Sequence, residues 1–177
     1  HYKNKAYLPV NLYAATKQAF EDIAKFYIEN FDIDFVTLKL NDTYGPADKR
    51  RKIFNLWKEI SETGQMLEMS AGEQLIDITY IDDVVNAYMG LIKILETDYS
   101  MKLKGKDFAV SSGKPIKLKD LAEKFSKVIG KKLNIKWGAK PYRKNEVMVP
   151  WNKGRRVPGW RPKVSIEEGI RKFLDCL

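Results

Sequence analysis

A tyrosine and a lysine lie four residues apart in the stretch Tyr13-Ala14-Ala15-Thr16-Lys17. In a helix this spacing places the two side chains on one face. There a lysine ammonium can favour tyrosinate, so the phenol can act as an acid or a base near neutral pH. With 9 tyrosines in a lysine-rich chain, about one such pair is expected by chance. The alternative is therefore a pair on a helix surface that takes part in no reaction. The motifs nearby in the sequence must distinguish this alternative from a catalytic pair.

Further segments accompany the pair in order. Pro9 precedes the tyrosine, Glu21 follows the lysine by four residues, and residues 37–46 (TLKLNDTYGP) and 72–85 (GEQLIDITYIDDVV) come next. Each of these features is weak evidence alone. Together they resemble the second half of an extended short-chain dehydrogenase/reductase of the NAD-dependent nucleotide-sugar epimerase/dehydratase family. The variants DTYGP and GEQxID look most like bacterial sugar reductases such as CDP-abequose and paratose synthases. The resemblance runs from about residue 9 to the C-terminus.

The resemblance implies roles for the pair and for a later tyrosine. Tyr13 would be the proton donor or acceptor at a sugar hydroxyl or ketone, while NAD or NADP exchanges a hydride at the same carbon. Lys17 would bind the nicotinamide ribose. This agrees with the chemistry, because hydride transfer to a carbonyl leaves an alkoxide that needs a proton delivered in place. Tyr44 ends the strand after this helix, where a parallel strand faces the ligand crevice, and is expected to contact the cofactor.

Four residues are expected to contact the substrate. The family usually has Asn at the position of Asp42 and Arg at that of Ile76. A carboxylate at position 42 would repel a diphosphate, and Gln74 is the nearest polar substitute for the arginine. Arg143 and Glu146 resemble the family's late Arg-x-x-Asp/Glu segment, where the Arg grips the diphosphate and the acid bonds nucleotide ribose hydroxyls. The alternative for this segment is an exposed charged loop.

The glycines indicate a missing piece. No two of the 11 glycines lie two or three residues apart, so the sequence contains no Gly-rich turn for a dinucleotide pyrophosphate. The sequence also begins with His1 rather than Met. We therefore expect a C-terminal fragment of a protein roughly twice as long, without the N-terminal dinucleotide-binding half and the catalytic Ser/Thr that the family carries there. Residues 1–177 are expected to form a single α/β unit that includes the substrate-binding subdomain.

Periodicity and turn signals predict the elements that position these residues. Apolar residues at helical spacing predict helices over residues 12–30, 51–63, 82–95, 118–129 and from 166 onward. Short β-rich runs predict strands at residues 35–40, 66–69, 75–80, 108–110 and 133–137. Ser165 and Glu168 form a capping-box pattern, and Asp82 and Asp83 are expected to cap a helix rather than to do chemistry. Residues 140–163, with four of the seven prolines, are expected to form an ordered loop. Alternating strands and helices give the α/β class.

The composition indicates the size of the domain, the cellular compartment and the kinds of site to expect. With 44% hydrophobic residues, 177 residues can bury the core of one domain. The single cysteine, Cys176, excludes an internal disulfide and fits a reducing compartment. No apolar run approaches the roughly 20 residues of a membrane span, and no signal peptide is visible, so we expect a cytoplasmic protein without a membrane partner. One histidine, His1, and the absence of clustered carboxylates argue against a metal site.

The net charge of +9 is unevenly distributed. Residues 1–98 carry −5 and residues 99–177 carry +14. A basic face can attract nucleic acid, anionic lipid or a phosphorylated small molecule. A lysine-rich solvated surface is the simpler interpretation, and no RNA-binding or zinc motif accompanies the charge, which disfavours a nucleic-acid partner.

The leading functional hypothesis is an NAD(P)-dependent enzyme that reduces a nucleotide-activated 4-keto-6-deoxysugar. A nucleotide-sugar 4-epimerase or 4,6-dehydratase is the alternative among enzymes. A non-catalytic binding or regulatory protein with the same fold is the alternative of another class, and the intact Tyr13 and Lys17 argue against it. In relatives the tyrosine-bearing helix packs against its symmetry mate, so Phe20, Ile23 and Tyr27 are expected to support a homodimer of the full protein.

Overall fold

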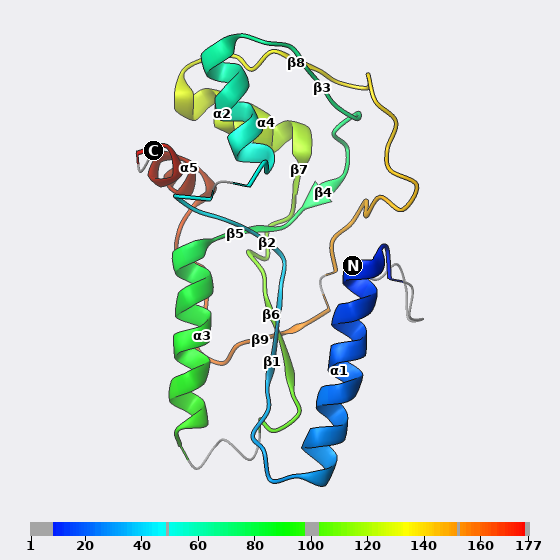
Figure 1. Ribbon diagram of the computed structural model, residues 1–177. Coiled ribbons are helices and arrows are strands. Elements are labelled where there is room, and N and C mark those ends of the chain that lie inside the picture. The colour runs from blue at the N-terminus through cyan, green and yellow to red at the C-terminus, as the bar shows by residue number, and fades with distance from the viewer. Residues whose placement is uncertain (1–8, 49, 98–102, 152, 176–177) are drawn as a thin grey trace.

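A small parallel sheet lies between two long helices in the computed structural model (Figure 1). The structure describes residues 9–48, 50–97, 103–151 and 153–175, so His1 and Cys176 lie outside the described residues. The sheet has three parallel strands, in the order β1 (Thr37–Leu40), β6 (Asp107–Val110) and β9 (Arg155–Arg156). The flanking helices are α1 (Leu12–Asn30) and α3 (Ile81–Leu95). The expected α/β class is confirmed.

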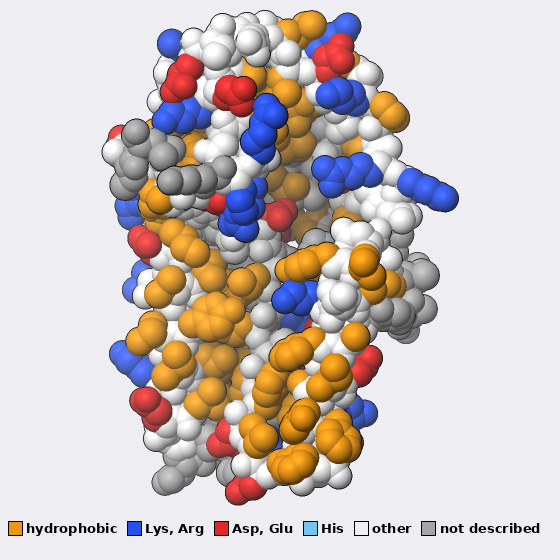
Figure 2. Space-filling model, in the orientation of Figure 1, with side chains coloured by type: hydrophobic (Ala, Val, Ile, Leu, Met, Phe, Trp, Pro, Cys, Tyr) orange, Lys and Arg blue, Asp and Glu red, His pale blue; other side chains and the backbone are white. Residues whose placement is uncertain are grey.

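The helix that carries the Tyr-Lys pair forms over the predicted residues. Asn11 caps it, since its side-chain oxygen accepts a hydrogen bond from the Ala14 amide at 2.9 Å. The small residues Ala14 and Ala24 are its buried positions. Large apolar residues on its outer face stay exposed, and a second exposed apolar stripe follows α3 (Figure 2). On α1 the exposed residues include Phe20, Ile23 and Tyr27.

An aromatic core fills the other part of the molecule, drawn above the sheet in Figure 1. Phe54, Trp57, Phe125 and Phe173 are buried, with neighbouring ring centroids 5.4–5.8 Å apart. The core lies among the helices α2 (Ile53–Thr63), α4 (Leu118–Ile129) and α5 (Ile166–Asp175). Two short ladders accompany them, parallel β3 (Leu67–Glu68) with β8 (Ile135–Lys136) and antiparallel β4 (Leu75–Ile76) with β7 (Ile116–Lys117).

A buried carboxylate joins the two parts. The strands β2 (Asp42–Tyr44) and β5 (Ile78–Tyr80) pair in parallel between them (Figure 1). Asp77, only 2% exposed, accepts hydrogen bonds from the Asn41 side-chain amide at 3.0 Å, the Ser112 backbone N–H at 2.8 Å and the Ser111 hydroxyl. The prediction of one strand over residues 75–80 is therefore wrong, because the chain changes partner at Asp77, from β7 to β2.

Other predicted boundaries shift for local reasons. The helix predicted from residue 51 begins at Ile53, because Lys52 stays extended as its N-cap. The strands predicted at 35–40, 66–69 and 133–137 are shorter, since only residues 37–40, 67–68 and 135–136 find ladder partners. The loop predicted over residues 140–163 contains β9, whose two exposed arginines give no strand signal.

Asp83 does not cap α3 as predicted. Its buried carboxylate accepts hydrogen bonds from the backbone N–H groups of Lys163 and Val164, at 3.0 and 2.9 Å, and so anchors the segment before α5. The predicted capping box is half formed. The Ser165 hydroxyl accepts from the Glu168 amide at 3.2 Å, whereas the Glu168 carboxylate pairs with Lys172 rather than returning to the cap.

Two helical glycines allow the tightness of this packing to be tested. A β-carbon added at Gly169 in α5 would overlap the Tyr44 hydroxyl, whereas nothing lies within 4 Å of one added at Gly90 in α3. We expect Gly169→Ala to lower the free energy of unfolding by about 1–3 kcal/mol through overpacking. The matched change Gly90→Ala should raise it by about 0.5–1 kcal/mol through helix propensity. Urea unfolding measures both, and a stabilising Gly169→Ala would contradict the close approach.

Candidate functional site

The Tyr-Lys pair shares one face of α1, as its spacing predicts. The Lys17 ammonium lies 5.4 Å from the centroid of the Tyr13 ring. The Tyr13 side chain is 64% exposed. Both residues belong to the first two turns of α1, and this end of the helix lies level with the junction formed by β2 and β5 (Figure 1). The phenol and the ammonium are therefore accessible at the end of the parallel sheet where ligands bind in open α/β folds.

A loop from the C-terminal third of the chain reaches the start of this helix. The Asn145 side-chain amide donates to the Val10 carbonyl at 3.5 Å, next to the cap of α1. Three residues later, the Met148 carbonyl accepts from the Leu75 amide at 2.9 Å. The loop thus spans from α1 to the segment that carries Gln74. The chain positions of these residues give no hint of this juxtaposition, which sequence analysis missed.

Arg143 and Glu146 occupy a turn of that loop. The Glu146 amide donates to the Arg143 carbonyl at 2.9 Å, which closes the turn. The Arg143 side chain is exposed and Glu146 is half-buried. Within the described ranges, neither side chain forms an ion pair. A guanidinium and a carboxylate without internal partners can contact a ligand without first breaking an ion pair.

Gln74 is buried beside this loop. It is 8% exposed, and its side-chain oxygen has no hydrogen-bond partner in the part of the chain that the structure describes. A buried acceptor without a donor costs about 1–3 kcal/mol, which a hydroxyl donor could offset. The preceding Glu73 is held by Lys117 at 2.8 Å and by Lys119, and hydrogen bonds from these two ammonium groups, Lys117 first, lower the pKa of Glu73 to about 2.

Asp42 and Tyr44 lie at the two ends of β2, with different surroundings. Desolvation by the neighbouring protein raises the pKa of Asp42 although its side chain still meets solvent; Lys52 opposes this shift and Asp77 adds to it. Tyr44 is buried, and its ring makes edge contacts with Phe54 and Tyr80 at centroid distances of 4.8 and 5.4 Å. Burial raises the pKa of Tyr44 well above its usual range. A cofactor contact by Tyr44 stays a prediction, and its burial leaves little of the ring for a ligand.

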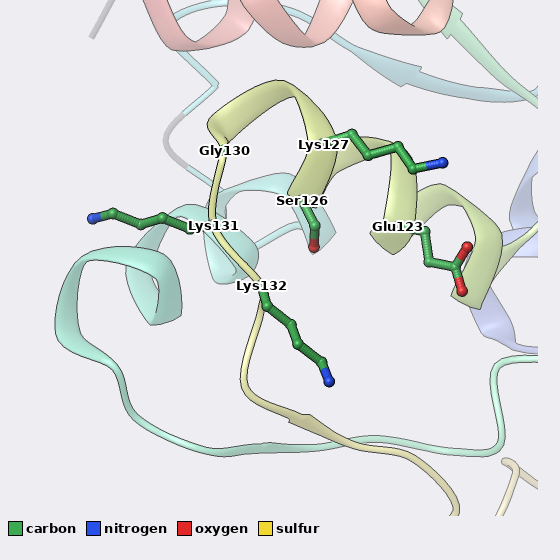
Figure 3. A pocket seen from close by; sticks show the side chains of 6 residues that line it. All are labelled: Glu123, Ser126, Lys127, Gly130, Lys131 and Lys132. Carbon is green, nitrogen blue, oxygen red and sulfur yellow. The ribbon is translucent and has the colours of Figure 1, made fainter.

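Two hollows lie on the surface, the smaller of them at the same end of the sheet as the Tyr13–Lys17 pair. One, of about 390 Å³, lies at the C-terminal end of α4, where the lysine side chains diverge rather than converge on a common point (Figure 3). Another, of about 210 Å³, lies at the carboxyl end of β6, between Asp77, Ser111, Trp151 and Arg156. Neither contains a residue predicted to contact substrate or cofactor. Among the described residues, no group of three potential metal ligands occurs and no helix is long and apolar enough to cross a membrane.

Comparisons with known proteins agree on one family. Residues 2–101 match the NAD dependent epimerase/dehydratase family. The chain is 29% identical to CDP-abequose synthase of Salmonella typhimurium (strain LT2), over 99% of this chain and 59% of that protein, and 32% identical to CDP-abequose synthase of Salmonella muenchen, over 97% and 58%. It therefore spans about three fifths of the length of these curated relatives.

A solved structure supports the same fold. The UDP-glucuronic acid 4-epimerase of Bacillus cereus, in complex with UDP-glucuronic acid and NAD, matches 99% of this chain and 55% of its own. The TM-score is 0.81 at 22% identity, so this likeness concerns the fold alone. The expectation of a Rossmann-like α/β fold of the nucleotide-sugar epimerase type is confirmed.

The raised pKa of Asp42 predicts a pH-dependent stability effect. An acid whose pKa is higher in the folded state destabilises the fold above its unfolded pKa, near 3.8, and has no such effect when protonated in both states. Asp42→Asn should therefore increase the free energy of unfolding at pH 7, with a smaller gain at pH 3. Urea unfolding at both pH values measures this. The exposed loop change Asp34→Asn is the control, and a gain of equal size at both pH values would contradict the assignment.

Proposed function

Because the chain belongs to the NAD dependent epimerase/dehydratase family, we propose that it forms the substrate-binding part of an NAD(P)-dependent enzyme that acts on a nucleotide-activated sugar. The observation that carries this proposal is the accessible Tyr13, with the Lys17 ammonium over its ring, beside a loop that offers an unpaired Arg143. Among reactions of this family, we favour reduction of a 4-keto-6-deoxysugar, because two relatives that match nearly the whole chain are CDP-abequose synthases.

The residues of this chain fit one end of the cofactor. The exposed Tyr13 and Lys17 can meet a nicotinamide and its ribose, since both project from the start of α1 at the carboxyl end of the sheet. When bound, the nicotinamide would supply the hydride. The sequence contains no Gly-rich turn for the pyrophosphate, so we propose that this contact is made by a part of the full protein that precedes these residues.

Tyr13 is proposed to donate the proton. Hydride addition to the sugar carbonyl carbon leaves a negative oxygen, and the Tyr13 hydroxyl would transfer its proton to that oxygen. The phenolate that remains would be stabilised by the nearby Lys17 ammonium, whose charge favours the ionised form. Both side chains lie on the same face of α1, so one rigid helix sets their separation.

The substrate contacts proposed for this chain come from the loop and from the segment before β4. Arg143 would hold the diphosphate through charge-assisted hydrogen bonds, and Glu146 would accept from nucleotide ribose hydroxyls. The unpartnered Gln74 oxygen could accept from a hydroxyl of the substrate. The Asp42 carboxylate would present an unfavourable charge to a diphosphate, unlike the Asn that the family usually has at this position.

A 4-epimerase is the second candidate, and we include a 4,6-dehydratase with it. Both would use the same tyrosine and lysine, and an epimerase shares this fold. Cofactor stoichiometry distinguishes them from a reductase. The reductase consumes one NAD(P)H for each sugar converted, whereas the other two reactions leave the cofactor unchanged after each turnover. We also propose that the full protein is cytoplasmic and forms a homodimer. The exposed apolar residues Phe20, Ile23 and Tyr27 on α1 support the dimer interface.

Replacing the phenol hydroxyl tests the catalytic role. In the full enzyme, Tyr13→Phe should lower kcat by about 10²–10⁴-fold, because the hydroxyl acts mainly in the transition state. The affinity for the nucleotide sugar should change little. Steady-state kinetics and calorimetry measure the two effects, and Tyr88→Phe, at an exposed tyrosine on α3, is the control. A near-normal kcat for Tyr13→Phe would remove the main support for the enzymatic proposal.

Removing the proposed diphosphate contact should mainly change KM, whereas removing the Tyr13 hydroxyl should mainly change kcat. Arg143→Ala should raise KM through loss of a charge-assisted contact worth about 1.5–3 kcal/mol, with a smaller effect on kcat. Lys144→Ala, the neighbouring exposed cation, is the matched control for a general loss of positive charge. Equal changes in KM for the two variants would show that the loop attracts the substrate only through its overall charge.

A further inference from the structure

Lys39 joins α1 to two strands of the sheet. From β1, its ammonium contacts the Glu21 carboxylate on α1 at 3.0 Å and the Asp107 carboxylate on β6 at 2.8 Å. The side chains of Lys39 and Glu21 are about one quarter exposed. Burial lowers the pKa of Lys39, but hydrogen bonds to Asp107 and Glu21 more than offset it, so the net shift is upward. The ammonium is therefore held firmly between two carboxylates from different elements.

Glu21 has another cation within reach on its own helix. It follows Lys17 by four residues, a spacing at which oppositely charged side chains on a helix attract each other. In the structure the two do not pair, and the Lys17 ammonium lies over the Tyr13 ring instead. Lys25, four residues after Glu21, pairs with Glu29 at 3.7 Å. Within the described part of α1, Lys17 is thus the lysine without a carboxylate partner.

We propose that Lys39 is a positioning residue for the Tyr13–Lys17 pair. By holding Glu21 against the sheet, it keeps the Lys17 ammonium free for the phenol and for the cofactor. Without Lys39, Glu21 and Asp107 would face each other as two unneutralised carboxylates. Their repulsion would turn Glu21 toward Lys17, and the resulting ion pair would draw the ammonium off the Tyr13 ring. This inference rests on the proposed function.

The test compares four variants of the full enzyme. Lys39→Met should weaken NAD binding, measured by calorimetry, and lower kcat, each by about fivefold, the factor that corresponds to a surface ion pair of about 1 kcal/mol. Lys39→Arg, which keeps the charge, should stay within twofold of the native enzyme. Lys39→Met combined with Glu21→Gln should recover both values, because the competing carboxylate is gone. Asp107→Asn, which leaves Glu21 held, should leave NAD affinity unchanged.

Several outcomes would overturn the proposal. A double variant as impaired as Lys39→Met, or equal losses of NAD affinity in Asp107→Asn and Lys39→Met, would show that Lys39 only stabilises the fold. Thermal unfolding of every variant separates that role from positioning. Should Lys39→Met not fold, Lys39→Gln carries the same expectations. Tyr13→Phe in the same assay separates the two proposals. If it keeps kcat, the proposed function fails, whereas the calorimetric comparison still decides the role of Lys39.

Discussion

The buried carboxylate of Asp77 is the interaction on which the arrangement of this protein depends. A carboxylate that is almost completely shielded from solvent is tolerated only when its hydrogen-bonding capacity is satisfied. Its hydrogen bonds come from Asn41, which follows β1, and from Ser111 and Ser112, which follow β6. The same residue marks the place where the chain leaves the antiparallel ladder with β7 and enters the parallel pair with β2. The sheet and the aromatic core are thereby fixed to each other at one point.

The candidate site lies along this junction because several independent contacts converge there. Asn145 ties the late loop to the residue before the α1 cap, and the Met148 carbonyl ties it to β4. Farther along α1, Lys39 fixes the helix to the sheet through Glu21. The proposed site would have its tyrosine on a rigid helix and the charges proposed to hold the ligand on a loop. That division suits a chemical step that needs fixed geometry and a substrate that must enter and leave.

Close packing sets the distance between the two parts. Gly45 follows β2 where a β-carbon would overlap the Ile81 side chain at the start of α3. Gly169 allows the Tyr44 hydroxyl to approach α5 in the same manner. The Tyr44 ring thus packs in the aromatic core, while its main chain lies in β2, next to the junction. A residue that the family pattern places beside the cofactor can therefore also be a packing residue.

The sequence by itself determined the features that depend on near neighbours. The helix over residues 12–30 follows from apolar periodicity, and the helix over 118–129 ends at Gly130 in the left-handed conformation that glycine favours. The shared face of Tyr13 and Lys17 follows from helical spacing alone. The family was recognisable as well, because its motifs are local and their order is preserved.

Only the tertiary structure decided the features that depend on distant partners. β9 exists because β6 offers an edge, and its exposed arginines carry no strand signal of their own. Asp83 binds backbone groups about 80 residues away, so its position at the start of a helix suggested a cap instead. The burial of Gln74 is fixed in the same way, by contacts from other parts of the chain. Local pattern predicts which elements form, whereas hydrogen bonds and packing between remote segments decide what each side chain meets.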